Sequence, residues 1–119
     1  MDFNSILIGS DNAPALVAYY TKLLGEPGFQ QGDYTGWKIG SGYITVYPHS
    51  EVHGQNTTPG RFMWNIETAD VTGDFERMKA AGAIVVRAPY EFDEAPGSSI
   101  ATLADPDGNY FQLLSPMEM

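Results

Sequence analysis

The sequence predicts an α+β fold made of two βαβββ modules, with eight strands and two helices. Three observations lead to this prediction. One strand, one helix and three further strands can be identified in each half of the chain. Breaks that contain Gly, Pro, Ser or Asn separate these segments. The length of 119 residues and the hydrophobic content of 43% suit one compact domain built by duplication of a module.

The first half begins with a predicted strand at residues 3–8, where apolar and β-branched residues gather. A helix is expected at residues 12–24, because a Ser-Asp-Asn sequence supplies N-cap chemistry and apolar residues then recur at helical spacing. Gly25 ends that helix. Three strands are expected next, at residues 29–31, 35–39 and 43–47. The Gly-Ser-Gly sequence at 40–42 indicates a hairpin between the last two.

Residues 49–60 are polar, contain Gly and Pro and show no periodicity, so they are expected to form a loop between the modules. A strand at 61–68 and a helix at 71–81, capped by Asp70, follow. The remaining strands are expected at residues 84–87, 100–103 and 110–114. Two connections separate them, an acidic loop at 91–98 and a tight Asp-Pro-Asp-Gly-Asn turn at 105–109.

The two halves can be aligned on shared landmarks. These are Phe3 with Phe62 and Asp11 with Asp70, each 59 residues apart, and Tyr43 with Tyr110, which are 67 residues apart. We therefore predict a single domain over residues 1–119, with modules at about 1–48 and 61–119 joined by the loop 49–60.

Composition excludes several classes of partner and chemistry. A net charge of −9 argues against nucleic acid or an anionic membrane as the main partner, because both need a positive surface. The absence of cysteine excludes disulfides, a thiol nucleophile and thiolate metal ligands. The chain lacks a signal-like start and any apolar run near the roughly 20 residues that span a bilayer, so we expect a cytoplasmic protein.

Residues 104–113, which read Ala-Asp-Pro-Asp-Gly-Asn-Tyr-Phe-Gln-Leu, resemble a signature of the vicinal oxygen chelate superfamily. That superfamily includes glyoxalase I (lactoylglutathione lyase), bleomycin- and fosfomycin-resistance proteins and extradiol dioxygenases. Residues 6–25 resemble its first helix, and the resemblance covers essentially the whole chain. It implies curved sheets whose concave faces help to form a ligand cavity, and a homodimer as the assembly. In catalytic members, the first and last strands of each module supply four side chains to a divalent metal.

Alternation along the strands assigns a cavity face to the second module. At 61–68, Phe62, Trp64 and Ile66 are expected against the helix, and Met63, Asn65 and Glu67 on the cavity face. On the last strand, Phe111 and Leu113 are expected in the core, and Tyr110, Gln112 and Leu114 on the cavity face. Through the internal repeat, Asn4 corresponds to Met63 and Thr45 to Gln112.

The four metal-ligand positions that the resemblance implies are Asn4, Thr45, Met63 and Gln112. None is charged or an imidazole, whereas divalent ions prefer carboxylate, carbonyl, imidazole or thiolate ligands. We therefore expect no metal and no cofactor. A slip of two residues in the fourth strand would place Tyr47 or His49 at the position of Thr45, and a divalent metal is the alternative.

Other candidates have weaker patterns. Glu67 on the cavity face could act as a general base, but an exposed or ion-paired carboxylate is the commoner role. His49 could carry protons at the cavity mouth, although it lies in a predicted loop. Trp37 and Tyr47, near strand ends, are expected to form apolar walls that stack a planar ligand. The surplus negative charge favours a neutral or cationic ligand.

The sequence therefore predicts a small-molecule-binding protein of the glyoxalase/bleomycin-resistance type without the divalent metal site. The expected ligand-binding residues are Asn4, Trp37, Thr45, Tyr47, Met63, Asn65, Tyr110 and Gln112. One alternative is a glyoxalase-like lyase or isomerase, which either holds a metal through a ligand placed elsewhere or works metal-free with Glu67 or His49. The other is a regulatory or interaction module whose cavity is filled by its own side chains.

Overall fold

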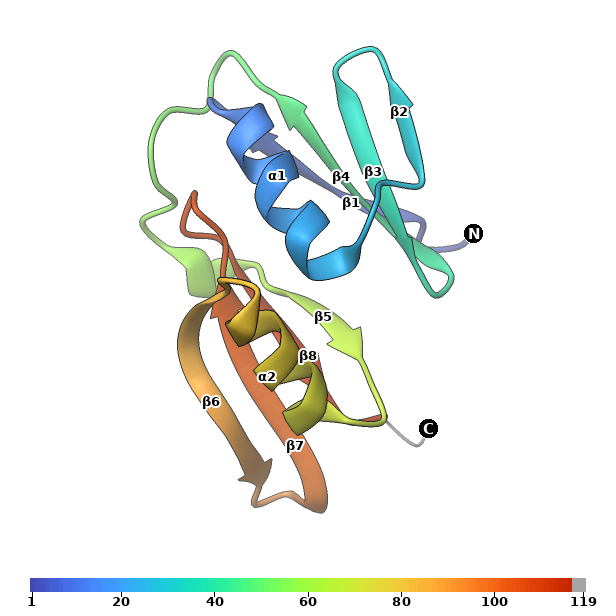
Figure 1. Cartoon of the computed structure of the whole chain (residues 1–119), viewed down its shortest axis with the longest axis vertical. Coiled ribbons are helices and arrows are strands. Elements are labelled where there is room, and N and C mark those ends of the chain that lie inside the picture. Colours follow the sequence, from blue (N-terminus) through green and yellow to red (C-terminus); the bar gives the residue numbers. More distant parts are fainter. Residues whose placement is uncertain (117–119) are drawn as a thin grey trace. The chain divides into compact units, whose positions relative to one another are not determined.

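The computed structural model describes residues 1–116, which form eight strands and two α-helices and confirm the predicted α+β fold (Figure 1). The chain divides into two compact units, Met1–Gln55 and Asn56–Met119, at a point inside the predicted loop. Each unit contains one four-stranded sheet and one α-helix. No helix among residues 1–116 is long and apolar enough to span a membrane.

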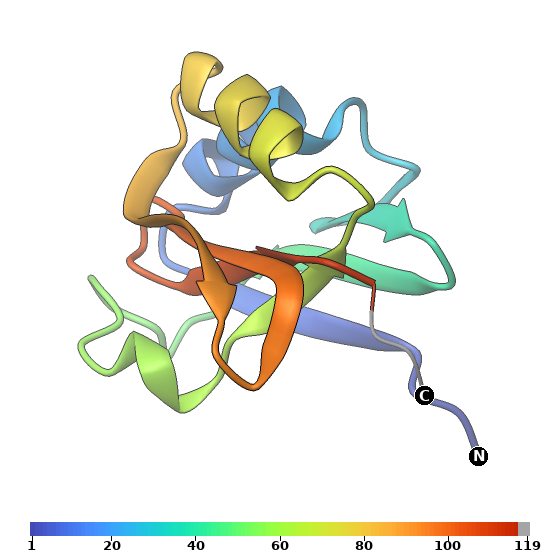
Figure 2. The same ribbon diagram turned by 90° about the horizontal axis from the view of Figure 1, so that it is seen from below.

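The first unit contains, in chain order, β1 (Ser5–Ser10), α1 (Ala13–Leu24), β2 (Phe29–Gln31), β3 (Tyr34–Ile39) and β4 (Gly42–Pro48). The strand order in the sheet is β1-β4-β3-β2, with β1 parallel to β4 and the other neighbours antiparallel. Helix α1 lies over one face of this sheet (Figure 2). Its buried Leu16, Tyr20 and Leu23 form a core together with Ile44 and Val46 of β4.

The second unit contains a short 3-10 turn (Pro59–Arg61), β5 (Trp64–Glu67), α2 (Val71–Ala80), β6 (Ile84–Phe92), β7 (Ala95–Ala104) and β8 (Tyr110–Leu114). The order β5-β8-β7-β6 repeats the topology of the first sheet. Phe111 and Leu113 are fully buried on the side of α2, as alternation predicted. The predicted turn is also present, since Asp105 Oδ1 accepts hydrogen bonds from the backbone N–H groups of Asp107 and Asn109.

Two local predictions in the second half are wrong. Residues 91–98 are not a loop: β6 and β7 continue through this segment as a hairpin, with only Asp93 and Glu94 in the turn. The Glu91 carboxylate accepts a hydrogen bond from the Gly97 N–H at 2.6 Å, so an acidic residue stabilises the hairpin. The predicted strand at 61–68 is shorter, because Arg61 ends the 3-10 turn and Phe62 and Met63 precede β5; Phe62 is 81% exposed instead of packed against the helix.

The offset between the modules also differs from the sequence alignment. Ser5 pairs with Tyr43, whereas the pairing of Trp64 with Phe111 places Met63 opposite Tyr110. The side chains that cap α1 and α2 belong to Asn12 and Asp70, which are 58 residues apart, not 59. Ser5, not Asn4, therefore occupies the position equivalent to Met63.

Candidate ligand-binding faces

Each sheet has one face that packs against its own helix and an opposite face, which we call the first and the second open face. Pairing and alternation place eleven residues on the first: Ser5, Leu7, Gly9, Phe29, Gln31, Tyr34, Gly36, Lys38, Tyr43, Thr45 and Tyr47. The second carries Met63, Asn65, Glu67, Ile84, Arg87, Tyr90, Ile100, Thr102, Ala104, Tyr110, Gln112 and Leu114. The second face contains the six residues that alternation assigned to it from the sequence, and the first contains Thr45 and Tyr47 of those expected at the cavity.

Aromatic pairs dominate the first open face. Tyr34 and Tyr47 stack with ring centroids 5.1 Å apart and planes only 3° from parallel. Phe29 and Tyr43 meet edge to face at 6.1 Å. Gly36 lies between the pairs, and a Cβ at this position would overlap the Phe29 ring. The missing side chain therefore allows the Phe29 ring to lie across the sheet.

A hollow of about 540 Å³ opens beside these rings, lined by Phe29, Gln31, Gly32, Asp33 and Tyr34. Aromatic faces and a carboxylate are the groups that attract planar or cationic molecules. The arrangement can therefore hold such a molecule by stacking, with Asp33 as the nearest source of negative charge.

A second hollow, of about 390 Å³, lies where β1 and β4 end and is lined by Ser10, Asp11, Pro48, His49, Ser50, Val52 and His53. His49 contacts Tyr47 edge to face at 5.7 Å, and its Nδ1 accepts a hydrogen bond from the Glu51 N–H. Asp11 accepts a hydrogen bond from the Gly54 N–H at 2.8 Å. Both histidines thus line one hollow, although their spacing in a loop gave no reason to expect it.

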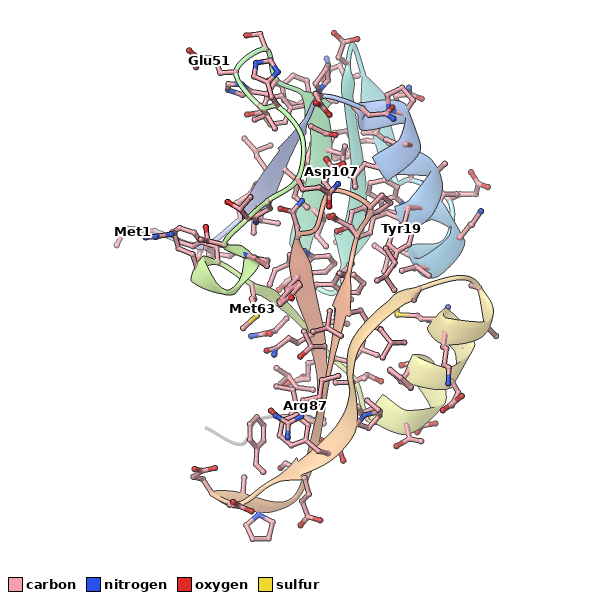
Figure 3. All side chains as sticks on the ribbon, turned by 90° about the vertical axis from the view of Figure 1, so that its left-hand side faces the viewer. Met1, Tyr19, Glu51, Met63, Arg87 and Asp107 are labelled. Carbon is pink, nitrogen blue, oxygen red and sulfur yellow. The ribbon has the colours of Figure 1, made fainter. Side chains whose placement is uncertain are left out.

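A polar row crosses the second open face from one edge to the other: Arg87, Thr102, Gln112 and Asn65. Gln112 Nε2 donates to Thr102 Oγ1 at 3.0 Å. The Arg87 guanidinium lies over the ring of Tyr90, with Cζ 3.5 Å from the ring centroid. Figure 3 shows Arg87 on the strand β6. The second open face therefore presents hydrogen-bonding side chains, whereas the first presents aromatic rings.

The structure distributes the predicted site residues over both faces. Thr45 and Tyr47 lie on the first, and Met63, Asn65, Glu67, Tyr110 and Gln112 on the second. Sequence reasoning did not assign a site role to Ser5, Thr102 or Arg87. Alternation along a strand allows two phases, and only burial in the structure, as at Val46, selects between them for the first sheet.

The prediction that Trp37 forms a ligand wall is wrong. Its side chain is only 2% exposed and packs against Tyr20 of α1, with ring centroids 6.0 Å apart. Its Nε1 donates to the Gly25 carbonyl at 2.9 Å, which ties β3 to the end of the helix. Asn4 precedes β1 and has the phase of Ile6 and Ile8, which are on the helix side. Alternation therefore excludes both residues from the open face.

The ligand positions of the superfamily, corrected for the offset, carry Ser5 and Thr45 in the first unit and Met63 and Gln112 in the second. These side chains are hydroxyls, a thioether and an amide. Among residues 1–116, no three His, Asp or Glu side chains are grouped so that they could hold a metal ion.

Comparisons with known proteins agree with this architecture. A profile of a family described as "Glyoxalase-like domain" matches residues 5–114. A solved glyoxalase/bleomycin resistance protein/dioxygenase family enzyme from Burkholderia phytofirmans PsJN is 22% identical, with a TM-score of 0.76 over 98% of this chain and 100% of that one. A glyoxalase/bleomycin resistance protein from Catenulispora acidiphila DSM 44928 is 18% identical, with a TM-score of 0.75 and the same coverage.

TioX from Micromonospora sp. ML1 is 16% identical, with a TM-score of 0.73 over 98% of this chain and 100% of that one. A search of curated proteins found no match. At these identities the solved structures establish the fold.

Proposed function

Because this chain belongs to the glyoxalase-like domain family, within the vicinal oxygen chelate superfamily, we propose that it binds a small organic molecule without the superfamily's divalent metal. The observation that carries the proposal is the chemistry of the open faces. One presents paired aromatic rings and the other a row of hydrogen-bonding groups. Both kinds of surface occur in sites for organic molecules, where apolar walls supply affinity and a few polar groups supply orientation.

The donor set supports a role without metal. Ser5, Thr45, Met63 and Gln112 contribute no negative charge and no imidazole at the superfamily's ligand positions. Mg²⁺ and Mn²⁺ require charged or carbonyl oxygens to replace their hydration shell, and Ni²⁺ and Zn²⁺ prefer imidazole or thiolate. These four side chains do not fit such an ion, and no step through a metal is part of the proposed function.

The first open face favours a planar ligand that is neutral or cationic. A ring inserted beside Tyr34 would extend the stack that Tyr34 and Tyr47 already form. Asp33 and the net charge of −9 add attraction for a cation.

We also propose a cytoplasmic homodimer. A single chain leaves Phe3 and Phe62 more than 80% exposed and Leu7 largely exposed. Large exposed apolar side chains are typical of surfaces that associate. Light scattering after size exclusion would measure the mass, and a monomer at micromolar concentration would contradict this assembly.

The metal-free role is tested by elemental analysis and by thermal unfolding. Protein purified without chelator is expected to hold no stoichiometric Ni, Zn, Mn or Fe. An equimolar amount of Ni²⁺, Zn²⁺ or Mn²⁺ is expected to leave Tm unchanged, because only an ion that binds the native state stabilises it. A rise of several degrees that Gln112→Ala abolishes would instead support the metal-dependent lyase or isomerase.

Ligand binding is tested with 1-methylquinolinium, a planar cation. We expect it to perturb the amide NMR signals of β2, β3 and β4 at millimolar concentration, and Tyr47→Ala to weaken this binding several-fold. Lys22→Ala, on α1, is the control and should change nothing. If neither this cation nor any organic molecule from the producing cell binds, the proposed function fails. The result would then favour the alternative of a regulatory or interaction module whose cavity is filled by its own side chains.

A further inference from the structure

We propose that the polar row of the second open face binds the carboxylate of a small organic ligand, with Arg87 as its anchoring side chain. This inference rests on the proposed binding function and names the chemical group recognised at this face. The row consists of Arg87, Thr102, Gln112 and Asn65, one from each strand of the sheet.

The four side chains are neighbours across the sheet. Arg87 pairs with Thr102, Thr102 with Gln112, and Gln112 with Asn65, so the row runs β6-β7-β8-β5. Paired residues project from the same face, and strands are spaced by about 4.8 Å, so the row spans about 14 Å. The row is therefore wider than a carboxylate, which Arg87 would hold together with the neighbouring Thr102 and Gln112, while Asn65 would face another part of the ligand.

Arg87 has no carboxylate partner among residues 1–116. Its contact is with the aromatic ring of Tyr90, and an ion pair of this unit joins a different arginine, Arg77, to Asp74. Glu67 lies on the strand at the far edge of the sheet, on the next row. The Tyr90 ring holds the guanidinium against the sheet, and a guanidinium offers donors that match the two oxygens of a carboxylate.

The neighbouring groups complement an anion without adding charge. One N–H of the Gln112 side-chain amide donates a hydrogen bond to the hydroxyl of Thr102. Thr102 is only 7% exposed, so this hydrogen bond holds the amide in one orientation. The amide groups of Gln112 and Asn65 provide further donors.

One positive charge among neutral donors suits a monoanion. A dianion such as a phosphate monoester would retain an uncompensated charge beside a protein of net charge −9. The long-range repulsion by that net charge is screened beyond about 8 Å at physiological ionic strength, so Arg87 determines the local preference. A monoanionic carboxylate is therefore the group that this face favours.

The test compares two probes of the same shape, 1-naphthylacetate and its neutral amide 1-naphthylacetamide, by NMR titration of the intact protein. We expect the acetate to bind at least about fivefold more tightly than the amide, as charge-assisted hydrogen bonds are the stronger ones. The acetate should also shift the side-chain signals of Gln112 and Asn65. Arg87→Gln should remove the preference and leave the affinity for the amide unchanged.

Arg77→Gln is the matched control, since it removes the same charge from an exposed position on α2 and should retain the preference. Equal affinities of the two probes for the unmodified protein, or equal weakening of both by Arg87→Gln, would overturn the carboxylate assignment. Absence of acetate binding would overturn it as well. In each of these cases binding of 1-methylquinolinium would preserve the proposed function, whereas its failure would contradict that function separately.

Discussion

The two open faces differ in chemistry although they belong to sheets of identical topology. The equivalent central rows are Phe29-Gly36-Thr45-Leu7 in the first sheet and Arg87-Thr102-Gln112-Asn65 in the second. One is largely apolar and the other entirely polar. The strand order is the same in both because the ladders and the helix-facing side chains determine it. The open faces are not bound by this requirement, so their side chains differ in chemistry while the topology stays the same.

The helix-facing sides, in contrast, use the same kind of packing. Trp37 packs against Tyr20 of the first helix, and Trp64 stacks on Phe111 with ring centroids 4.9 Å apart. Large aromatic side chains stabilise both cores through burial. The contrast between the two faces of each sheet leads to the following predictions.

The largest effect is expected at Phe111. Phe111→Ala removes a fully buried ring and should lower the free energy of unfolding by about 3–5 kcal/mol. Gln112→Leu, one residue along on the opposite face, should cost about 1 kcal/mol, because Thr102 loses its hydrogen-bond donor. Urea denaturation measures both values. A larger loss for Gln112→Leu would mean that the faces of β8 are exchanged.

A smaller effect is expected at Gly36. Gly36→Ala places a Cβ where the Phe29 ring lies, so the ring must move away from Tyr43. We expect a loss of about 1–2 kcal/mol and a changed near-UV circular dichroism spectrum. Gly28→Ala is the control, because the nearest atom to its added Cβ is 3.8 Å away. If both variants behave alike, Gly36 does not shape the aromatic face.

The smallest effects concern the helix caps and test the 58-residue offset. Asp70→Ala should cost about 1 kcal/mol, since its carboxylate accepts the Gly73 N–H at 2.9 Å. Asn12→Ala should cost somewhat less, because its bond to the Ala15 N–H is longer, at 3.4 Å. Asp11→Ala should lower the helix content, measured by far-UV circular dichroism, less than either of these variants, because Asp11 does not cap α1. A loss of helix in Asp11→Ala that matches Asp70→Ala would restore the offset of 59.

Local patterns in the sequence were sufficient for the order of helices and strands along the chain and for much of the second open face. Successive side chains of a strand point to opposite faces, so the assignment of Phe111 and Leu113 to the core needs no knowledge of the partner strand. The Asp105–Asn109 turn was predictable for the same reason, because its hydrogen bonds connect residues within four positions of each other.

The tertiary structure alone decided the register between strands and the partners of individual side chains. Trp37 is on the helix side, and Ser5 replaces Asn4, because the phase of a strand depends on which residues of a distant strand lie opposite. The hairpin through residues 91–98 forms because Glu91 pairs with Ser99 and Phe92 with Ala95, and this pairing overrides the loop-like composition. Arg87 lacks an acidic partner for a similar reason: the strand order puts Glu67 at the other edge of the sheet. Sequence determined which residues alternate, and long-range pairing determined what each of them faces.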